Sequence, residues 1–381
     1  MKMEHAWTTT IFKKSFTGCP SGSKYTVSNA SVDIAEFLQL QKSGYPVVDA
    51  RTPAEFQSGH IPGAINLPLF NDEERKVIGT IYKQNGREKA ILHGLKFVGP
   101  RLKELAEYGL DISDSGEEHK VLIHCWRGGM RSSSLAWLFN LMGIRTCTLR
   151  RGYKTFRKYV TDTFQTPVPL TVLGGKTGSA KTLILGELQK QGEQVIDLEG
   201  LAYHRGSAFG AIYNMGQRGH VTQEQFENNL AMIMRACTPE KPVWIEDESR
   251  QVGSIVIPAG LWENMRSSRV MYLDIPRDIR TSYLVNQYGQ DEVHLLKQSF
   301  TDIKKRLGDV RYQEALSAME SNDLHGACNI ALDYYDRAYE FGLSKRQSSF
   351  IKKIKLETID VAMVTGILLE SVYEGNQINQ I

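Results

Sequence analysis

The sequence has few cysteines and no long apolar run. Its 381 residues include five cysteines, none of them in Cys-x-x-Cys spacing, which argues against both a disulfide framework and a zinc site. No apolar stretch approaches the roughly 18 residues that a membrane span needs. The first residues also lack the apolar core of a signal peptide. We therefore expect a cytoplasmic protein.

Acidic residues are missing from one stretch of the chain. The formal net charge is only +3, yet residues 121–160 contain no Asp or Glu. The same stretch contains eight cations: Arg127, Arg131, Arg145, Arg150, Arg151, Lys154, Arg157 and Lys158. A short run of like charge is usually a solvated face, but eight unopposed positive charges predict a surface that faces a polyanion.

The chain is long enough for two domains. Residues 1–30 are polar and rich in Ser, Gly and Thr, and we expect them to form a flexible extension. Strand and helix patterns alternate over residues 31–160, which predicts a parallel α/β sheet, and the prolines of TFQTPVPL indicate a linker. A second strand–helix series over residues 161–290 precedes a mostly helical region, residues 291–381.

The segment HCWRGGMRSS lies between an apolar strand pattern and a helix pattern. Gly128 and Gly129 permit turns with positive φ, so that backbone amides can point inward as they do in anion-binding loops. The helix N-terminus, Arg127 and Arg131 add positive charge, which favours the thiolate form of a cysteine. Cys125 is therefore predicted to be a nucleophile rather than a packing residue.

Two chemistries fit this loop. The pattern HC-x5-R-S is typical of cysteine-dependent phosphatases, whose arginine holds the phosphate that the thiolate attacks. A loop of the same kind also stabilises a cysteine persulfide or selenopersulfide. Upstream, VVDARTPAEFQSGHIPGAINLP closely resembles the first signature of the rhodanese superfamily, which includes one phosphatase branch. In that segment Asp49 and Arg51 either hold the loop or serve only the fold, and Pro62 with Gly63 is expected to fix a bend.

The segment LTVLGGKTGSAKTLIL is typical of a strand, a glycine loop and a helix. Its GKTGSAKT matches a P-loop, except that Ala180 replaces the second glycine. We expect Lys181 to reach terminal phosphate oxygens and Thr182 to ligate a metal, with Mg²⁺ the candidate. A left-handed conformation at Ala180 would cost roughly 1–2 kcal/mol, which argues against efficient nucleotide hydrolysis but not against binding. The predicted phosphate-binding residues are Gly175, Thr177, Gly178, Ser179, Lys181 and Thr182.

Two further segments of this second domain are candidates for the site. In VWIEDES, Asp247 is the expected Mg²⁺-side carboxylate, with Glu246 and Glu248 as alternatives; a solvated helix start is the simpler interpretation. LEGLAYHRGSAFG has neither strand nor helix period, and we interpret it as a functional loop near the P-loop. Its candidate residues are His204, as an acid or base, Arg205 and Ser207.

CWRGGMRS, GGKTGSAKT, DLEGLAYHRGSAFG, QEQFENNL and IEDESRQVG together resemble the tRNA 2-selenouridine synthase family, over roughly residues 35–350. The resemblance implies a rhodanese-like parallel-sheet domain, then a P-loop NTPase-like α/β domain with a helical C-terminal region. It also implies a transferase that acts on tRNAs for lysine, glutamate and glutamine. This enzyme replaces the sulfur of wobble 2-thiouridine with selenium from selenophosphate, through S-geranyl-2-thiouridine made from geranyl diphosphate. Ala180 departs from the family's usual glycine.

The resemblance gives each loop a substrate. The P-loop would hold the diphosphate of geranyl diphosphate without consuming ATP or needing a tightly bound cofactor. Cys125 would carry selenium as a selenopersulfide, with Arg127 and Arg131 orienting selenophosphate. Trp126 either stacks on a base of the tRNA or packs on its own domain. The residues expected to bind tRNA are Trp126, Arg150, Arg151, Lys154, Arg157 and Lys158.

Three other functions fit the same residues. A Cys-x5-Arg phosphatase fused to a kinase-like module would turn over aryl phosphates or ATP. An inert rhodanese module would tether a P-loop protein to partners, although a tether has no need of a reactive thiol. An ATP-dependent tRNA sulfurtransferase would carry persulfide sulfur on Cys125.

Overall fold

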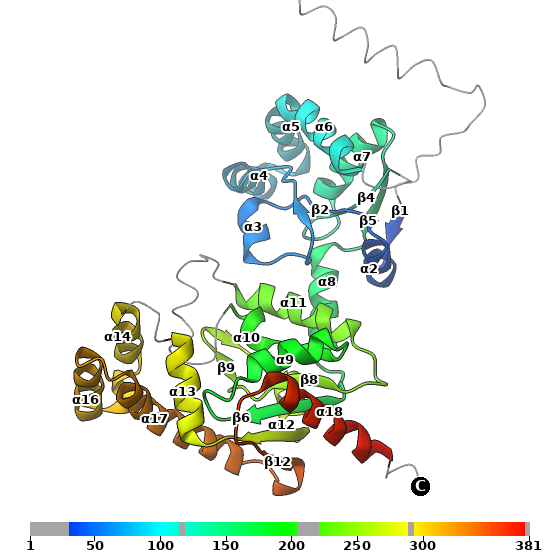
Figure 1. Ribbon diagram of the computed structural model, residues 1–381. Coiled ribbons are helices and arrows are strands. Elements are labelled where there is room, and N and C mark those ends of the chain that lie inside the picture. The colour runs from blue at the N-terminus through cyan, green and yellow to red at the C-terminus, as the bar shows by residue number, and fades with distance from the viewer. Residues whose placement is uncertain (1–29, 114–118, 204–220, 289–292, 378–381) are drawn as a thin grey trace, which may run out of the picture. The chain divides into compact units, whose positions relative to one another are not determined.

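The computed structural model describes residues 30–113, 119–203, 221–288 and 293–377. These residues form two compact units, coloured along the chain in Figure 1. The first unit contains residues 30–51 and Ile65–Gly152, and the second contains Thr52–Ala64 and the chain from Tyr153 onward. The expected N-terminal extension lies outside the described residues. No described helix combines the length and apolar character needed to cross a bilayer.

A five-stranded, all-parallel sheet forms the first unit, in the order β1-β5-β4-β2-β3. Its strands are β1 (Ala30–Val32), β2 (Val47–Asp49), β3 (Ile65–Asn66), β4 (Lys120–His124) and β5 (Arg145–Leu149). The central strands are continuous apolar runs because a parallel sheet is buried on both faces, and Val48 and Ile123 are fully buried. The carboxyl ends of β2 and β4 lie side by side, with Asp49 paired to His124.

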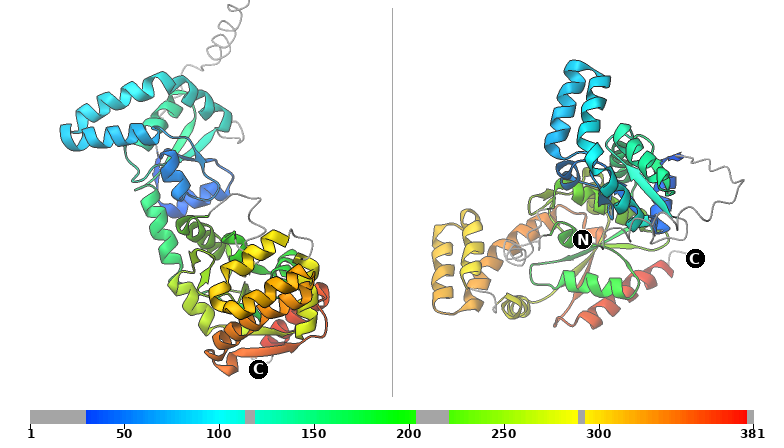
Figure 2. Two further views of the ribbon diagram at one scale, coloured as in Figure 1. Left: turned by 90° about the vertical axis from the view of Figure 1, so that its left-hand side faces the viewer. Right: turned by 90° about the horizontal axis from the view of Figure 1, so that it is seen from above.

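The helices of the first unit are α2 (Ile34–Lys42), α4 (Asp72–Asn85), α5 (Arg87–Val98), α6 (Leu102–Ser113) and α7 (Met130–Leu141). Helices α4 and α5 lie antiparallel as a hairpin, seen in blue and cyan in Figure 2. Asn71 and Glu74 form a capping box at the start of α4. Helix α7 is followed by Gly143 at φ 83°, a left-handed residue of the kind that ends helices.

The second unit contains another parallel sheet, in the order β12-β11-β6-β8-β7. Its strands are β6 (Leu170–Gly175), β7 (Gln194–Ile196), β8 (Val243–Glu246), β11 (Arg269–Asp274) and β12 (Ile351–Lys355). Strand β6 is central, so the loop that follows it leaves from the middle of the sheet's carboxyl edge. Strand β12 lies within the region expected to be mostly helical. Its sequence, IKKIK, carries three lysines, so an apolar pattern did not reveal it.

Helices α9 (Lys181–Lys190) and α18 (Val361–Gln377) lie side by side against this sheet (Figure 1). Ile184, Leu188, Val364 and Leu368 from these two helices share one apolar core with the strands. A short antiparallel hairpin joins β9 (Gln251–Val252) to β10 (Ile255–Val256). The other helices of the unit are α3 (Pro53–Ser58), α8 (Tyr153–Thr163), α10 (Leu198–Leu201), α11 (Gln223–Ala236), α12 (Ala259–Ser267), α13 (Arg277–Tyr288), α14 (Val293–Asp302), α15 (Lys304–Leu307), α16 (Asp309–Glu320) and α17 (Leu324–Ser344).

The short segment 52–64 makes its contacts with α11 of the second unit. The hydroxyl of Thr222 donates to the carbonyl of Ser58 at 2.6 Å. The amide of His60 donates to Gln225 Oε1 at 2.8 Å, and Asn228 Nδ2 donates to the His60 carbonyl at 2.9 Å. Much of the QEQFENNL segment therefore serves to anchor residues 58–60.

Close packing beside these hydrogen bonds explains why residue 59 is a glycine and what the Tyr153 hydroxyl contacts. A Cβ on Gly59 would lie 2.7 Å from Glu224 Oε1 and 3.0 Å from Tyr153 Oη. The Tyr153 hydroxyl donates to Glu224 Oε1 at 2.8 Å. Helix α8, expected at the end of the first domain, thus packs within the second unit. In the segment 52–64, Thr52 and Glu55 form a capping box at the start of α3, and the positive φ of Gly63 agrees with the expected bend.

Candidate functional sites: a thiol loop and a phosphate loop

The thiol loop, residues 125–129, joins β4 to α7. Cys125 is only 3% exposed and borders the apolar core. Its Sγ nevertheless accepts a hydrogen bond from the Gly129 amide at 3.3 Å and lies 3.2 Å from Ser132 Oγ. The sulfur is therefore held by polar groups of the loop and of the first turn of α7, at the N-terminal end of that helix.

Two glycines let the backbone close around Cys125. Gly128 has φ 63°, and a Cβ there would lie 2.8 Å from the Leu149 carbonyl oxygen. Gly152 has φ 57°, and a Cβ there would lie 2.1 Å from the Cys125 carbonyl oxygen. Gly129 has an extended backbone (φ −105°, ψ −151°), so it contributes its amide and not the expected positive-φ turn. Sequence reasoning missed Gly152, although a glycine three residues after a buried strand was a signal for it.

Gly152→Ala is expected to destabilise the first unit by about 3 kcal/mol or more, because backbone atoms cannot give way to the new methyl group. Gly143→Ala is the matched control: its φ is also positive, but a Cβ there meets no atom within 4 Å. Strain alone at Gly143 costs about 1–2 kcal/mol. Urea unfolding of both variants measures the difference, and equal losses would contradict the close approach.

A fully buried ion pair supports the thiol loop from β2. Arg51 donates to Asp49 Oδ2 from Nε at 2.9 Å and from Nη2 at 2.7 Å. Burial would raise the pKa of Asp49, but nearby His124 and the Arg51 guanidinium outweigh it and hold that pKa below its usual range. The guanidinium also lies 5.7 Å from the ring centroid of Trp126 in the loop. Asp49 and Arg51 thus serve the fold and the loop together, the choice that the sequence left open.

The expected tRNA-binding residues do not all present a free charge. Arg157 forms ion pairs with Glu224 and Glu227 of α11. Its charge is therefore compensated within the second unit, and its assignment to tRNA binding stays a prediction. Lys158 pairs with Asp162 one turn along α8, but both side chains are exposed and such a pair is weak. Exposed side chains remain at Trp126, Arg150, Arg151, Lys154 and Lys158.

The phosphate loop has the predicted strand–loop–helix form, with β6 ending at Gly175 and α9 beginning at Lys181. Lys181 Nζ donates to the Gly175 carbonyl at 2.9 Å, so this lysine lies across the loop. Ala180 has φ 55° and ψ 27°, the left-handed conformation that its place in the pattern requires. That conformation costs about 1–2 kcal/mol. Alanine recovers roughly 0.5–1 kcal/mol of this because it loses less backbone entropy than glycine on folding, which explains why it is tolerated.

Helix α17 holds the start of the phosphate loop. The Gly175 amide donates to Tyr339 Oη at 2.9 Å, and Lys176 Nζ donates to Glu340 Oε1 at 2.6 Å. A Cβ on Gly174 would lie 2.8 Å from Tyr339 Oη, so a glycine is needed at this point of β6. These partners lie more than 160 residues from the loop in sequence, and no sequence motif predicted them.

The next residue of the loop is held through a second ion pair. Arg280 donates from Nη1 to the Thr177 carbonyl at 2.9 Å and from Nη2 to Asp336 Oδ2 at 2.8 Å. Arg280 is 2% exposed and Asp336 9% exposed. Three successive residues of the loop are therefore fixed by side chains of α13 and α17.

Asp247 has a structural role in place of the expected metal-ligating one. Its Oδ2 accepts from the Tyr339 hydroxyl at 2.9 Å, and its Oδ1 accepts from the Arg346 guanidinium. Burial and the Asp247 charge hold the pKa of Tyr339 well above its usual value. Thr182, the other expected ligand, donates to Glu199 Oε2 at 3.1 Å. Over the described ranges, no three Asp, Glu, His or Cys side chains are grouped to hold a metal.

Two glutamates beside the loop hold protons more tightly than usual. Burial, and then neighbouring carboxylates, keep the pKa of Glu246 well above its usual value, and its Oε1 accepts from the Glu199 amide at 2.7 Å. Burial and the Glu199 carboxylate raise the pKa of Glu248 to about 8 against the opposing charge of Lys181. At neutral pH Glu248 is therefore mostly uncharged and leaves the positive charge of Lys181 for an anion. His204, Arg205 and Ser207 lie outside the described residues.

Comparison with known protein families finds a match for each half of the chain. Residues 33–159 match the rhodanese-like domain family, and residues 168–365 match the family described as the tRNA 2-selenouridine synthase AAA domain. The tRNA 2-selenouridine synthase of Shewanella pealeana is 32% identical over 357 residues, covering 84% of this chain and 95% of that protein. This chain belongs to the tRNA 2-selenouridine synthase family.

Other members and solved structures complete the comparison. The tRNA 2-selenouridine synthase of Hydrogenovibrio crunogenus is 34% identical, covering 82% of this chain and 93% of that protein. Among solved structures, a yeast protein tyrosine phosphatase of the rhodanese family is 19% identical over 35% of this chain and 89% of its own, with a TM-score of 0.24. A similarity this weak does not bear on chemistry. Membership in the tRNA 2-selenouridine synthase family rests on the sequence matches.

Proposed function

We propose that this member of the tRNA 2-selenouridine synthase family replaces the sulfur of wobble 2-thiouridine with selenium. The tRNA substrates would be those for lysine, glutamate and glutamine, as the family resemblance implies. The proposal assigns one substrate to each loop: geranyl diphosphate to the phosphate loop and selenophosphate to the thiol loop. Two features of this one chain support the proposal: a cysteine sulfur that accepts a hydrogen bond from a loop amide, and a P-loop.

The phosphate loop would serve the geranylation step. The sulfur of 2-thiouridine attacks C1 of geranyl diphosphate, the C–O bond breaks, and diphosphate leaves with the electron pair while N3 of the base loses its proton to water. Lys181 and the amides of residues 178–181 would stabilise the charge that develops on the diphosphate. Because Asp247 is engaged elsewhere, it does not fit a Mg²⁺ ion at this loop, and no step here depends on one.

The thiol loop would serve the selenium step. The balance of electrons restricts which atom the Cys125 thiolate can attack. Selenium has the same oxidation state in selenophosphate and in 2-selenouridine, so its transfer requires no oxidant. A selenopersulfide on Cys125, the form expected from the sequence, would require one. We therefore place the thiolate at phosphorus, where it needs no redox partner.

In this scheme selenophosphate adds through selenium to C2 of S-geranyl-2-thiouridine, and geranylthiol leaves with a proton. The Cys125 thiolate then attacks phosphorus, the P–Se bond breaks, and 2-selenouridine departs with the electron pair. Water hydrolyses the phosphocysteine to phosphate and restores the thiol. Arg127 and Arg131 would bind the phosphate oxygens. In this scheme the loop performs phosphatase-like chemistry, and Cys125 carries a phosphoryl group and not selenium.

The decisive experiment incubates the protein with 2-thiouridine tRNA, geranyl diphosphate and selenophosphate, without ATP. Nucleoside mass spectrometry should detect S-geranyl-2-thiouridine and then 2-selenouridine. A requirement for ATP would favour an ATP-dependent sulfurtransferase. Turnover of aryl phosphates or ATP without tRNA would favour a phosphatase–kinase fusion.

Glu248→Gln should remove a pH dependence of geranyl diphosphate binding. In the natural protein Glu248 ionises as the pH rises through about 8, and its charge then repels the diphosphate beside Lys181. Affinity should fall by about threefold to tenfold above that pH and stay constant in Glu248→Gln. Glu263→Gln, at an exposed position on α12, is the matched control and should behave like the natural protein.

Glu248 should also make folding stability depend on pH. Its folded-state pKa of about 8 lies above the ordinary value of 4.5, so the folded state binds the proton more tightly than the unfolded state. This contribution is fully present below the ordinary pKa and is lost as the pH rises through about 8. Thermal melts should show a loss of Tm over this range that Glu248→Gln lacks. Parallel curves for the two proteins would contradict a proton on Glu248.

A further inference from the structure

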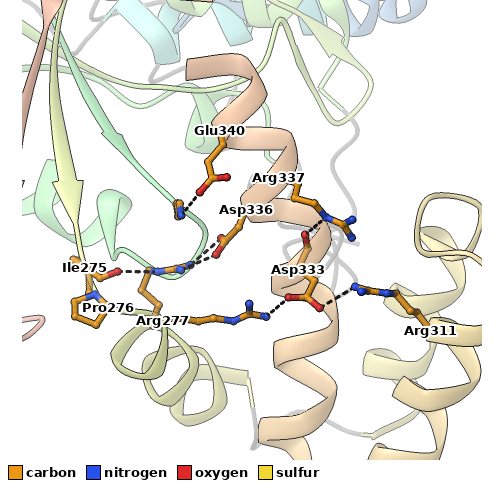
Figure 3. Close-up of a pocket in the computed structure, with 10 residues that line it drawn as sticks. Ile275, Pro276, Arg277, Arg311, Asp333, Asp336, Arg337 and Glu340 are labelled. Carbon is orange, nitrogen blue, oxygen red and sulfur yellow. Dashed lines mark hydrogen bonds and ion pairs between the residues drawn. The ribbon is translucent and has the colours of Figure 1, made fainter. Parts of the chain in front are cut away.

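A cavity of about 580 Å³ opens beside the phosphate loop, between α13, α16 and α17 (Figure 3). It shares Lys176 with the loop, and the family comparison does not explain it. Ten residues line it: Lys176, Ile275, Pro276, Arg277, Arg280, Arg311, Asp333, Asp336, Arg337 and Glu340. Five of these side chains are cationic and three are anionic, which leaves an excess of two positive charges in the cavity.

The charged side chains nearest the phosphate loop are already paired with one another. Arg280 pairs with buried Asp336, and Lys176 pairs with Glu340. Both pairs hold the loop, as described above, so they form a neutral wall of the cavity. The excess charge therefore belongs to the other residues of the lining.

On the opposite side, two guanidinium groups pair with the Asp333 carboxylate and a third contacts the backbone carbonyl of the same residue. Asp333 accepts from Arg277 Nη2 at 2.7 Å through Oδ1 and from Arg311 Nη1 at 2.8 Å through Oδ2. The hydrogen bond from Arg277 comes first among the causes that lower the pKa of Asp333. Arg277 and Arg311 are about two-fifths exposed, with side-chain exposures of 40% and 41%. Arg277 also donates from Nε and Nη2 to Asn329, so it would meet a ligand through Nη1.

The third guanidinium, on Arg337, is the least committed. Its Nε donates to the Asp333 carbonyl at 2.8 Å. Within the described part of the chain its two terminal nitrogens have no hydrogen-bond partner, and the side chain is exposed. Figure 3 shows Arg277, Arg311 and Arg337 converging on Asp333. Planar guanidinium groups arranged in this way match the oxygens of a phosphate.

We propose that this cavity binds a backbone phosphate of the RNA substrate through Arg277, Arg311 and Arg337. The inference rests on the proposed function, because geranylation brings the wobble sulfur to the diphosphate ester held by the phosphate loop. The backbone of the same RNA must then pass near that loop. The cavity adjoins the loop at Lys176 and carries the charge that a phosphodiester needs.

Arg337→Gln tests this assignment with little risk to the fold, since the side chain is exposed. Binding of 2-thiouridine tRNA should weaken by about threefold to tenfold at low salt, and the slope of log K against log salt should become shallower by about 0.7–1. The KM values for geranyl diphosphate and selenophosphate should not change. Lys352→Gln, an exposed lysine on β12, is the control and should leave tRNA binding as it is.

Asp333→Asn gives a change of opposite sign. It removes the carboxylate that competes for Arg277 and Arg311, so tRNA should bind about threefold tighter with a steeper salt slope. A purely structural role of this cluster would weaken binding in both variants. Unchanged tRNA binding in Arg337→Gln would overturn the inference, and so would a raised KM for selenophosphate or geranyl diphosphate, which would assign the cavity to a small phosphate compound. Failure of the natural protein to bind tRNA at all would instead refute the proposed function.

Discussion

Cys125→Ser is expected to lower the formation of 2-selenouridine by about 1000-fold or more, because a serine hydroxyl is a far weaker nucleophile toward phosphorus than a thiolate. Geranylation should continue within about twofold of its natural rate, since its groups lie on another loop. The product mixture should therefore accumulate S-geranyl-2-thiouridine or its selenium-phosphorylated successor. Nucleoside mass spectrometry separates these species by mass.

Cys237→Ser is the control for this change. Cys237 follows α11 and its thiol donates to the carbonyl of Ile233, so a serine there keeps the hydrogen bond and should leave both steps intact. If Cys125→Ser abolished geranylation as well, the division of labour between the loops would be refuted. If 2-selenouridine still formed at the natural rate, Cys125 would not be a nucleophile at all.

Lys181→Met is expected to reduce geranylation by about 100-fold or more, because it removes the one lysine that lies across the phosphate loop and would stabilise the departing diphosphate. Chemically prepared S-geranyl-2-thiouridine tRNA should still be converted to 2-selenouridine by this variant. That bypass assigns the defect to the first step, and tRNA analysis by mass spectrometry measures it.

Lys190→Met is the matched control, since Lys190 is at the other end of α9 and its side chain is 77% exposed. It should geranylate at the natural rate. A Lys181→Met protein that geranylates normally would remove the phosphate loop from the proposed mechanism. A defect that the geranylated tRNA does not bypass would show that the phosphate loop also serves selenium transfer.

The two loops could be predicted because the residues that form each of them are consecutive in the sequence. Cys125 directly follows the apolar strand β4, and Lys181 begins helix α9 after the loop that follows β6, as their local order in the sequence predicted. Ala180 was predicted from the pattern to need a left-handed conformation, and it has one. Short-range sequence thus carries most of the information about where each loop lies.

Side-chain partners far away in the chain were not predictable from the sequence. Asp247 was expected to face a metal, but Tyr339 and Arg346 occupy its oxygens about a hundred residues later. Arg157 was expected to face tRNA, but Glu227 of α11 takes its charge. A single sequence does not reveal which of two distant charges will meet, because folding decides it.

The contacts of residues 58–60 with α11 limit how this protein can be divided. The chain passes between its two units at residues 51–52, 64–65 and 152–153, so no single cut separates them. A fragment that ends near residue 160 would retain Tyr153, Phe156 and Ile61, all fully buried in the whole chain, without the helix that supplies Thr222, Gln225 and Asn228. Expression of this fragment alone should therefore give an aggregation-prone, poorly soluble product unless α11 is supplied in trans.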